Sequence, residues 1–202
     1  MSEINTNVNK RTRGRINDVF DWIHIFFIAI ILAGLLNCFV FQLIKIEQTS
    51  MVPTFMSGEK VLLSKAALWF NTPQCGDIIV FLDETKNENL IKRVIGVPGD
   101  TIEIKNNAIY RNGKKLNEPY INGTMVTNLY IVTGHDSNGN EITSTSITVP
   151  EGTYFCLGDN RNVSRDSRAL GCIPLEKILG KVVFRFNEMK AVSSFDHSYA
   201  DK

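Results

Sequence analysis

Two patterns of hydrophobic and polar residues divide this chain. Residues 22–44 read WIHIFFIAIILAGLLNCFVFQLI and carry no charge. As a helix, this segment would be about 34 Å long, enough to cross a hydrocarbon core of about 30 Å. A cleavable leader has an apolar core of only about 7–15 residues, followed by small residues. Here Lys45-Ile46-Glu47-Gln48 follows. The pattern therefore predicts an uncleaved transmembrane anchor over residues 22–44, with a buried core helix as the alternative.

The charges that flank this segment predict its orientation. Residues 1–21 form a short tail that contains Lys10, Arg11, Arg13 and Arg15. Short basic segments stay in the cytoplasm, whereas long domains cross the membrane largely regardless of charge. We therefore expect a cytoplasmic tail and an extracytoplasmic domain over residues 45–190, followed by a carboxyl-terminal tail over residues 191–202.

The second pattern is one of short apolar runs that are rich in β-branched and aromatic residues and separated by turn residues. It predicts a mainly β fold, an all-β domain, with a single helical candidate at residues 64–70. Asn112-Gly113 predicts a tight hairpin, and the polar segment 118–148 predicts a peripheral insertion. The runs are Val61-Leu62-Leu63, Ile78 to Phe81, Leu90 to Val97, Thr101 to Ile104, Ala108 to Arg111, Tyr154 to Leu157 and Lys181 to Phe186.

Charge and cysteine content exclude some classes of function. The net charge of +1, with scattered basic residues, gives no basis for binding nucleic acid. The four cysteines form no C-x-x-C pair, so a zinc site is not expected. Cys156 and Cys172 could pair in an exported domain, but their spacing does not decide this.

Ser50 and Lys92 are the candidate catalytic residues. Ser50 opens Ser-Met-Val-Pro-Thr just after the apolar segment, and Lys92 lies among aliphatic residues. A serine needs a base, and no histidine of this chain is well placed. A lysine can act as the base if burial lowers its pKa from about 10.4 to about 7, which requires roughly 4–5 kcal/mol. Taken singly, Ser50 could be a turn hydroxyl and Lys92 a surface lysine.

A third motif favours the catalytic interpretation of Ser50 and Lys92. Residues 158–171 form a dense polar segment directly after the apolar run Tyr154 to Leu157. Its hydroxyls and carboxylates could orient a base and pair with arginines. Asp166 and Arg168, two residues apart, could equally be structural.

With these three motifs in this order after an amino-terminal anchor, the chain resembles type I signal peptidases of the single-span, Gram-positive-like branch. The resemblance runs from about Trp22 to about Phe186. It implies a serine endopeptidase that removes signal peptides from exported preproteins, with the lipid bilayer as its second partner and without metal or organic cofactor. The roles that it implies are Ser50 as nucleophile, Lys92 as general base, Ser164 as the lysine-orienting hydroxyl, Asp166 and Arg168 as a supporting ion pair, and Met51 and Pro53 as supports of the nucleophile turn.

The resemblance also predicts how substrate binds. Small residues would enter two pockets, with Leu90, Ile91 and Met51 as apolar walls, while the substrate strand adds to an edge strand. The Ser50 N–H would donate to the oxyanion. Some relatives have a serine two residues before the nucleophile as a second donor, whereas this chain has Gln48.

Of four alternatives, one, a degenerate family member that binds preproteins without cutting them, is opposed by the intact Ser50 and Lys92, and three stay open. A dedicated peptidase for special substrates such as surface-fibre subunits would carry the same motifs. A self-cleaving repressor shares Ser-Lys chemistry but needs a DNA-binding module in place of the anchor. A non-catalytic single-pass surface protein would explain the anchor and strands, but not the contexts of Ser50, Lys92 and Ser164.

Overall fold

The structure is a computed structural model that describes residues 20–35, 40–121, 130–135, 137, 139–186 and 190–191. The chain divides into two compact units, Met1–Val40 and Phe41–Lys202. The predicted basic tail lies almost wholly outside the described residues, as does most of the carboxyl-terminal tail.

The first unit contributes one helix, over residues 20–35. Among the described residues, no helix combines the length and the apolarity that crossing a bilayer requires. Residues 36–39 of the predicted anchor lie outside the described part of the chain.

The prediction that the apolar helix reaches Ile44 is wrong at its carboxyl end. Phe41–Lys45 is strand β1, which pairs antiparallel with β2, Lys60–Ser64, from Phe41↔Ser64 to Lys45↔Lys60. Pairing with β2 provides hydrogen-bond partners for the backbone of β1. Hydropathy alone cannot separate a short apolar strand from the end of an apolar helix.

A large sheet forms the body of the second unit, as predicted. Its strand order is β1-β2-β13-β3-β4-β11-β12, with β14 paired to β13. Neighbouring strands in this order are antiparallel. The further bounds are β3 (Ile78–Asp83), β4 (Glu88–Gly96), β11 (Thr153–Leu157), β12 (Ile173–Pro174), β13 (Ile178–Arg185) and β14 (Lys190–Ala191), with the short helices α2 (Ala67–Phe70), α3 (Ser167–Leu170) and η1 (Leu175–Lys177) between them.

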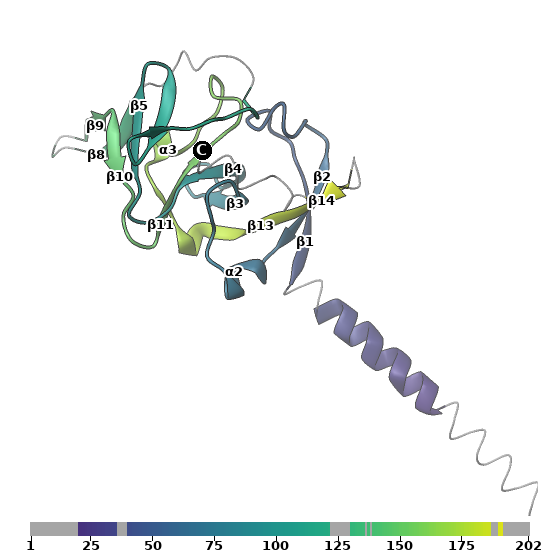
Figure 1. Ribbon diagram of the computed structural model, residues 1–202. Helices are drawn as coiled ribbons and strands as arrows, with labels where there is room; N and C mark the ends of the chain where they lie inside the picture. The colour runs from purple at the N-terminus through teal and green to yellow at the C-terminus, as the bar shows by residue number, and fades with distance from the viewer. Residues whose placement is uncertain are drawn as a thin grey trace, which may run out of the picture. The chain divides into compact units, whose positions relative to one another are not determined.

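Two smaller sheets complete the described fold, and Figure 1 shows their strands grouped away from β1 and β2. One has the order β10-β5-β6-β7 and the other pairs β8 with β9. The predicted insertion 118–148 is therefore not wholly peripheral, because its last strand, β10, pairs with β5. The bounds are β5 (Thr101–Lys105), β6 (Ala108–Arg111), β7 (Lys114–Lys115), β8 (Ile131–His135), β9 (Glu141–Ser144) and β10 (Ser146–Thr148).

The Asn112-Gly113 hairpin is confirmed. It joins β6 to β7, with Arg111 opposite Lys114. Asn112 has φ 53° and Gly113 has φ 79°. Positive φ at both central residues defines the tight turn that this dipeptide favours.

Strand β4 positions the candidate site because both of its faces are covered. Its residues from Leu90 to Gly96 are all buried. Ile91 packs in one core cluster with Met51 and Val80, whereas Leu90 and Val94 pack in another with Phe81. A polar side chain in the middle of this strand is therefore held in an apolar environment.

Candidate active site

The predicted nucleophile, Ser50, lies in a tight turn between β1 and β2. The turn is closed by backbone hydrogen bonds from Val52 N to Thr49 O at 3.2 Å and from Phe55 N to Met51 O at 2.9 Å. Met51 and Phe55 are both fully buried in the core. Pro53 is exposed and follows a cis peptide bond. The buried side chains on either side of Val52 therefore fix the turn, with Ser50 itself only 7% exposed.

Ser50 and Lys92 are brought together from positions 42 residues apart. Lys92 Nζ donates to Ser50 Oγ at 2.8 Å and to Ile91 O at 2.8 Å. The lysine side chain is 1% exposed. A hydroxyl and a buried amine are thus in direct contact, which is the geometry required for proton transfer between them.

Burial lowers the pKa of Lys92 from 10.5 to about 8, while the nearby Asp166 carboxylate acts in the opposite direction. Its apolar environment is partly the predicted one. Alternation along β4 puts Val94 and Leu90 on the same side of the strand as Lys92, and Ile91 and Ile95 on the other side. With a pKa of about 8, roughly a tenth of the amine is neutral at pH 7.

The predicted polar segment after β11 packs directly on the Ser50 turn. Asn160 N donates to Ser50 O at 2.9 Å, and Asn160 Nδ2 donates to Thr49 O at 3.2 Å. Gly158 lies so close that an added Cβ would be 2.5 Å from Ser50 O and 2.2 Å from Ser164 Oγ. No side chain fits at this position, which explains the glycine.

Ser164 lies beside this contact but does not make the bond that the resemblance implies. Its side chain is 5% exposed, and its Oγ is buried without a hydrogen-bond partner in the described part of the chain. It packs against Gly158 next to Ser50 O. Ser164 is therefore adjacent to the Ser50 turn, and its hydroxyl is free to accept or donate a further bond.

Asp166 and Arg168 form the predicted ion pair. Arg168 Nε donates to Asp166 Oδ1 and Arg168 Nη2 donates to Asp166 Oδ2, both at 2.8 Å, and the two side chains are almost fully buried. Asp166 Oδ2 also accepts from Gly158 N at 3.1 Å, and Arg168 Nη2 donates to Arg161 O at 2.6 Å. The pair thus fixes the loop that clamps Ser50.

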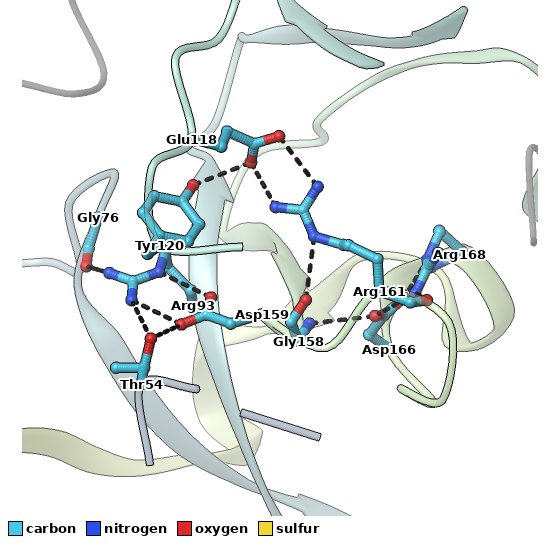
Figure 2. Close-up of polar contacts among 10 residues, drawn as sticks. All are labelled: Thr54, Gly76, Arg93, Glu118, Tyr120, Gly158, Asp159, Arg161, Asp166 and Arg168. Carbon is cyan, nitrogen blue, oxygen red and sulfur yellow. Dashed lines mark hydrogen bonds and ion pairs between the residues drawn. The ribbon is translucent and has the colours of Figure 1, made fainter. Parts of the chain in front are cut away.

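A second buried ion pair, unassigned by the sequence motifs, supports the other side of the loop (Figure 2). Arg93 Nε donates to Asp159 Oδ1 at 2.9 Å and Arg93 Nη2 donates to Asp159 Oδ2 at 2.7 Å. Thr54 Oγ1 donates to the same carboxylate, and Arg93 Nη1 donates to Gly76 O at 3.1 Å. Arg93 follows Lys92 on β4, so this pair connects the lysine strand to the loop and to the Ser50 turn.

Glu118 and Tyr120 extend this network, although the sequence placed them in a peripheral insertion. Glu118 binds Arg161 through both of its oxygens, and Tyr120 Oη donates to Glu118 Oε1 at 2.9 Å. The Tyr120 ring lies 4.0 Å below the Arg93 guanidinium. The run Glu118-Pro119-Tyr120 had no signal of this role, because its partners are distant in sequence.

A groove with a volume of about 300 Å³ lies between residues 44–48 and the first half of β4. Ile91, one of the predicted pocket walls, lines it together with Val80, whereas Leu90, another predicted wall, packs in the core on the other face of β4. Met51, the third predicted wall, is fully buried in the core. The groove is lined by Ile44, Lys45, Ile46, Glu47, Gln48, Val80, Glu88, Asn89 and Ile91.

Within the described part of the chain, Cys75, Cys156 and Cys172 take part in no disulfide bond. Burial raises the pKa of Cys156 well above its usual value, with Cys172 acting in the same direction. The side chain of Cys156 is fully buried beside Val94. It therefore contributes to the apolar environment around the lysine strand as an uncharged, small side chain.

Comparison with known proteins identifies the family of this chain. Residues 19–187 match the signal peptidase family, peptidase S26. The chain belongs to this family. It is 35% identical to "Signal peptidase I" of Bacillus licheniformis over 90% of this chain and 97% of that protein. It is 37% identical to "Signal peptidase IB" of Staphylococcus aureus (strain COL) over 90% of this chain and 95% of that protein.

Among solved structures, a signal peptidase I from Enterococcus faecalis is 34% identical, with a TM-score of 0.43, and the match covers 55% of this chain and 97% of that one. The relatives from Bacillus and Staphylococcus agree with the predicted Gram-positive branch. Signal peptidases cleave signal peptides from preproteins, and this chain is accordingly a peptidase of that class.

Proposed function

We propose that this signal peptidase works through a Ser-Lys dyad in which Ser50 is the nucleophile and Lys92 the general base. The observation that carries the proposal is the 2.8 Å contact between Lys92 Nζ and Ser50 Oγ, made by an amine that is 1% exposed. An uncharged amine at this distance can accept the hydroxyl proton as Ser50 attacks the scissile carbonyl.

The proposed reaction has two stages, acylation of Ser50 and hydrolysis of the acyl-enzyme. The Ser50 Oγ–carbonyl bond forms while the proton moves to Lys92 Nζ. The C–N bond of the tetrahedral intermediate breaks, and the same proton passes to the leaving amine. Lys92 then takes a proton from water as the water oxygen attacks the acyl-enzyme carbonyl. The bond between that carbonyl and Ser50 Oγ breaks, the proton passes from Lys92 to Ser50 Oγ, and the signal peptide leaves with a new carboxylate. The Ser50 backbone N–H is the proposed donor to the oxyanion.

The groove is the proposed binding site for the substrate main chain. β11 pairs with β4 only from Arg93 onward, so no described strand pairs with that edge of β4 before Arg93. The carbonyls of Asn89 and Ile91 accept side-chain hydrogen bonds from Gln48 and Lys92 respectively. Alternate residues of a strand face the same neighbour, so both carbonyls are suited to a strand added at this edge. The small residues that the family prefers would face the groove walls near Ile91.

We further propose that the apolar amino-terminal segment anchors the enzyme in the membrane, with the tail 1–21 in the cytoplasm and the β domain on the other side. Helix residues 20–35 contain only Asp21 and His24 as ionisable side chains. This composition suits contact with lipid. Such an anchor would hold Ser50 near the bilayer surface, where the apolar segment of a signal peptide ends.

The test of the dyad is to identify both the products and the acylated residue. The full-length chain in lipid vesicles should convert a preprotein into its mature form. Terminal sequencing of the mature form should place the cleaved bond where the first and third residues before it are small. A serine-reactive acylating inhibitor should label the peptide containing Ser50 and no longer label Ser50→Ala. Processing by Ser50→Ala at the unaltered rate would contradict the assignment.

The pH dependence of cleavage provides an independent prediction. Because burial lowers the pKa of Lys92 to about 8, kcat/KM should rise about tenfold per pH unit below that value and level off above it. The measurement is kcat/KM for a fluorogenic signal-peptide substrate between about pH 6 and about pH 10. A rise that continues toward 10.5, the value of an exposed lysine, would show that the base is solvated.

A further inference from the structure

Gln48 reaches across the proposed substrate groove. It stands two residues before Ser50, on the opposite side of the groove from β4. Its Nε2 donates to Asn89 O at 3.1 Å. The side chain thus joins the two walls of the groove at the level of Asn89.

The hydrogen bond from Gln48 occupies Asn89 O, the acceptor that a substrate strand added to β4 would require. Asn89 and Ile91 are two residues apart on β4, so a substrate residue opposite Asn89 lies about 7 Å, or two residues, beyond the one opposite Ile91. In the direction of Ser50, this edge of β4 is not available to the substrate, because Leu157 of β11 already pairs with Arg93. The acyl side of the substrate must therefore run from Ile91 toward Asn89. With the first residue before the cleaved bond opposite Ile91, the third lies opposite Asn89.

In the described part of the free enzyme, the Gln48 amide lacks one of its hydrogen bonds. Its Oε1 is buried and has no hydrogen-bond partner among the residues that the structure describes. A buried acceptor without a partner destabilises the position that it occupies. Moving the amide out of the groove would let water solvate both of its polar atoms, so an entering strand can displace it readily.

The hydrogen bond to Asn89 O also holds the Gln48 amide away from the position expected for the oxyanion. The amide nitrogen is engaged by Asn89, two residues further along the groove than Ile91, whose carbonyl contacts the Lys92 amine. A donor to the oxyanion would have to point toward the carbon that Ser50 attacks. The possibility that Gln48 replaces the second oxyanion donor is therefore not supported by its position.

We propose that Gln48 is a specificity-determining residue that occupies Asn89 O in the free enzyme and is exchanged for the main-chain N–H of the third residue before the cleaved bond. This inference rests on the proposed function. It predicts that a substrate lacking that N–H cannot complete the exchange, so the enzyme discriminates against it. It also predicts that shortening Gln48 strengthens binding, because the acceptor becomes free.

Binding is measured with full-length Ser50→Ala in detergent micelles and a fluorescent peptide that spans a cleavage site, so that no cleavage interferes. Gln48→Ala in this background should lower the Kd by about three- to tenfold, the equivalent of one ordinary hydrogen bond. The matched control is Gln42→Ala, which shortens an exposed glutamine of β1 outside the groove and should leave the Kd unchanged. Gln48→Met, which keeps the length of the side chain without a donor, should act in the same direction as Gln48→Ala.

A second peptide, N-methylated at the third residue before the cleaved bond, tests the exchange itself. With this peptide the gain from Gln48→Ala should disappear. An unchanged or higher Kd for the unmodified peptide would overturn the proposal, as would a fall of about 10²-fold in the kcat of Gln48→Ala with serine at position 50, which marks an oxyanion donor. Processing of a preprotein by Ser50→Ala at the unaltered rate would instead reject the proposed function, and the binding result would stand separately.

Discussion

Replacing Lys92 with methionine is expected to lower kcat for signal-peptide removal by about 10²- to 10⁶-fold, because general-base catalysis contributes about 10²–10⁴-fold and loss of the base in a serine-protease triad costs about 10⁶-fold. Lys92 is the proposed base, its Nζ contacts Ser50 Oγ, and its neighbours on β4 are apolar or paired. Methionine has a similar length and no proton acceptor of comparable strength. Ser50 would remain in its turn because Met51 and Phe55 hold it there.

The same substitution is expected to stabilise the folded chain. The pKa of Lys92 is lowered from 10.5 to about 8 by burial, and this difference corresponds to about 3 kcal/mol. The unfolded state then binds more protons between these two values, so the destabilisation is fully present below about pH 8 and disappears as the pH rises toward 10.5. Lys92→Met removes it, and the melting temperature at neutral pH should rise by several degrees.

Both effects are measured on the full-length chain in detergent micelles, by peptide cleavage and by thermal unfolding followed by circular dichroism. The control is Lys115→Met, at an exposed position of β7, which should change neither quantity. A Lys92→Met chain that still cleaves at a rate within tenfold of the original would show that another group acts as base. A lower melting temperature would show that the ammonium form is stabilised by its surroundings.

Local sequence signals predicted those parts of the fold and site that depend on residues close in the chain. The strand runs, the Asn112-Gly113 turn and the environment of Lys92 belong to this class, because alternation, turn chemistry and apolar neighbours are all read over a few positions. The contact between Ser50 and Lys92 is not local. It was expected only because several motifs appeared together in a known order.

The remaining features depend on partners that no short pattern identifies. Glu118 looked like part of a polar insertion, yet it neutralises Arg161 in the loop after β11. Residues 41–44 looked like the end of a helix, but β2 offers them a pairing partner. Gly158 resembles any turn glycine until Ser50 O and Ser164 Oγ are found against it. In each case a contact between distant segments decides the outcome, and local propensity does not.

Replacing Asp159 with alanine is expected to destabilise the chain by about 3–5 kcal/mol, because it removes the carboxylate that binds the buried Arg93 guanidinium through two hydrogen bonds. The side chains of the two residues are 3% and 0% exposed. Burial alone would lower the pKa of Arg93, but Asp159 outweighs it and the pKa is raised. The arginine therefore stays charged, and Thr54, Gly76 and Tyr120 cannot replace the lost carboxylate.

The measurement is the melting temperature, which should fall by about 6–20 °C for a chain of this size. The control is Glu103→Ala, which removes a carboxylate from the exposed pair with Lys105 and should change stability by less than about 1 kcal/mol. Cleavage should fall together with stability, since Asp159 directly precedes Asn160, whose N–H holds Ser50 O.

The double variant Arg93→Met with Asp159→Leu separates charge from packing. It removes both charges and fills the space with apolar atoms, so it should be markedly more stable than Asp159→Ala. If the double variant is as unstable as the single one, the pair stabilises the fold through its hydrogen bonds to Thr54 and Gly76 rather than by balancing a buried charge. If it is stable but cleaves slowly, the ion pair serves to align β4 with the loop, because Lys92 and Arg93 are adjacent on that strand while Asp159 and Asn160 are adjacent on the loop. The distance between Lys92 Nζ and Ser50 Oγ would then depend on a salt bridge that touches neither atom.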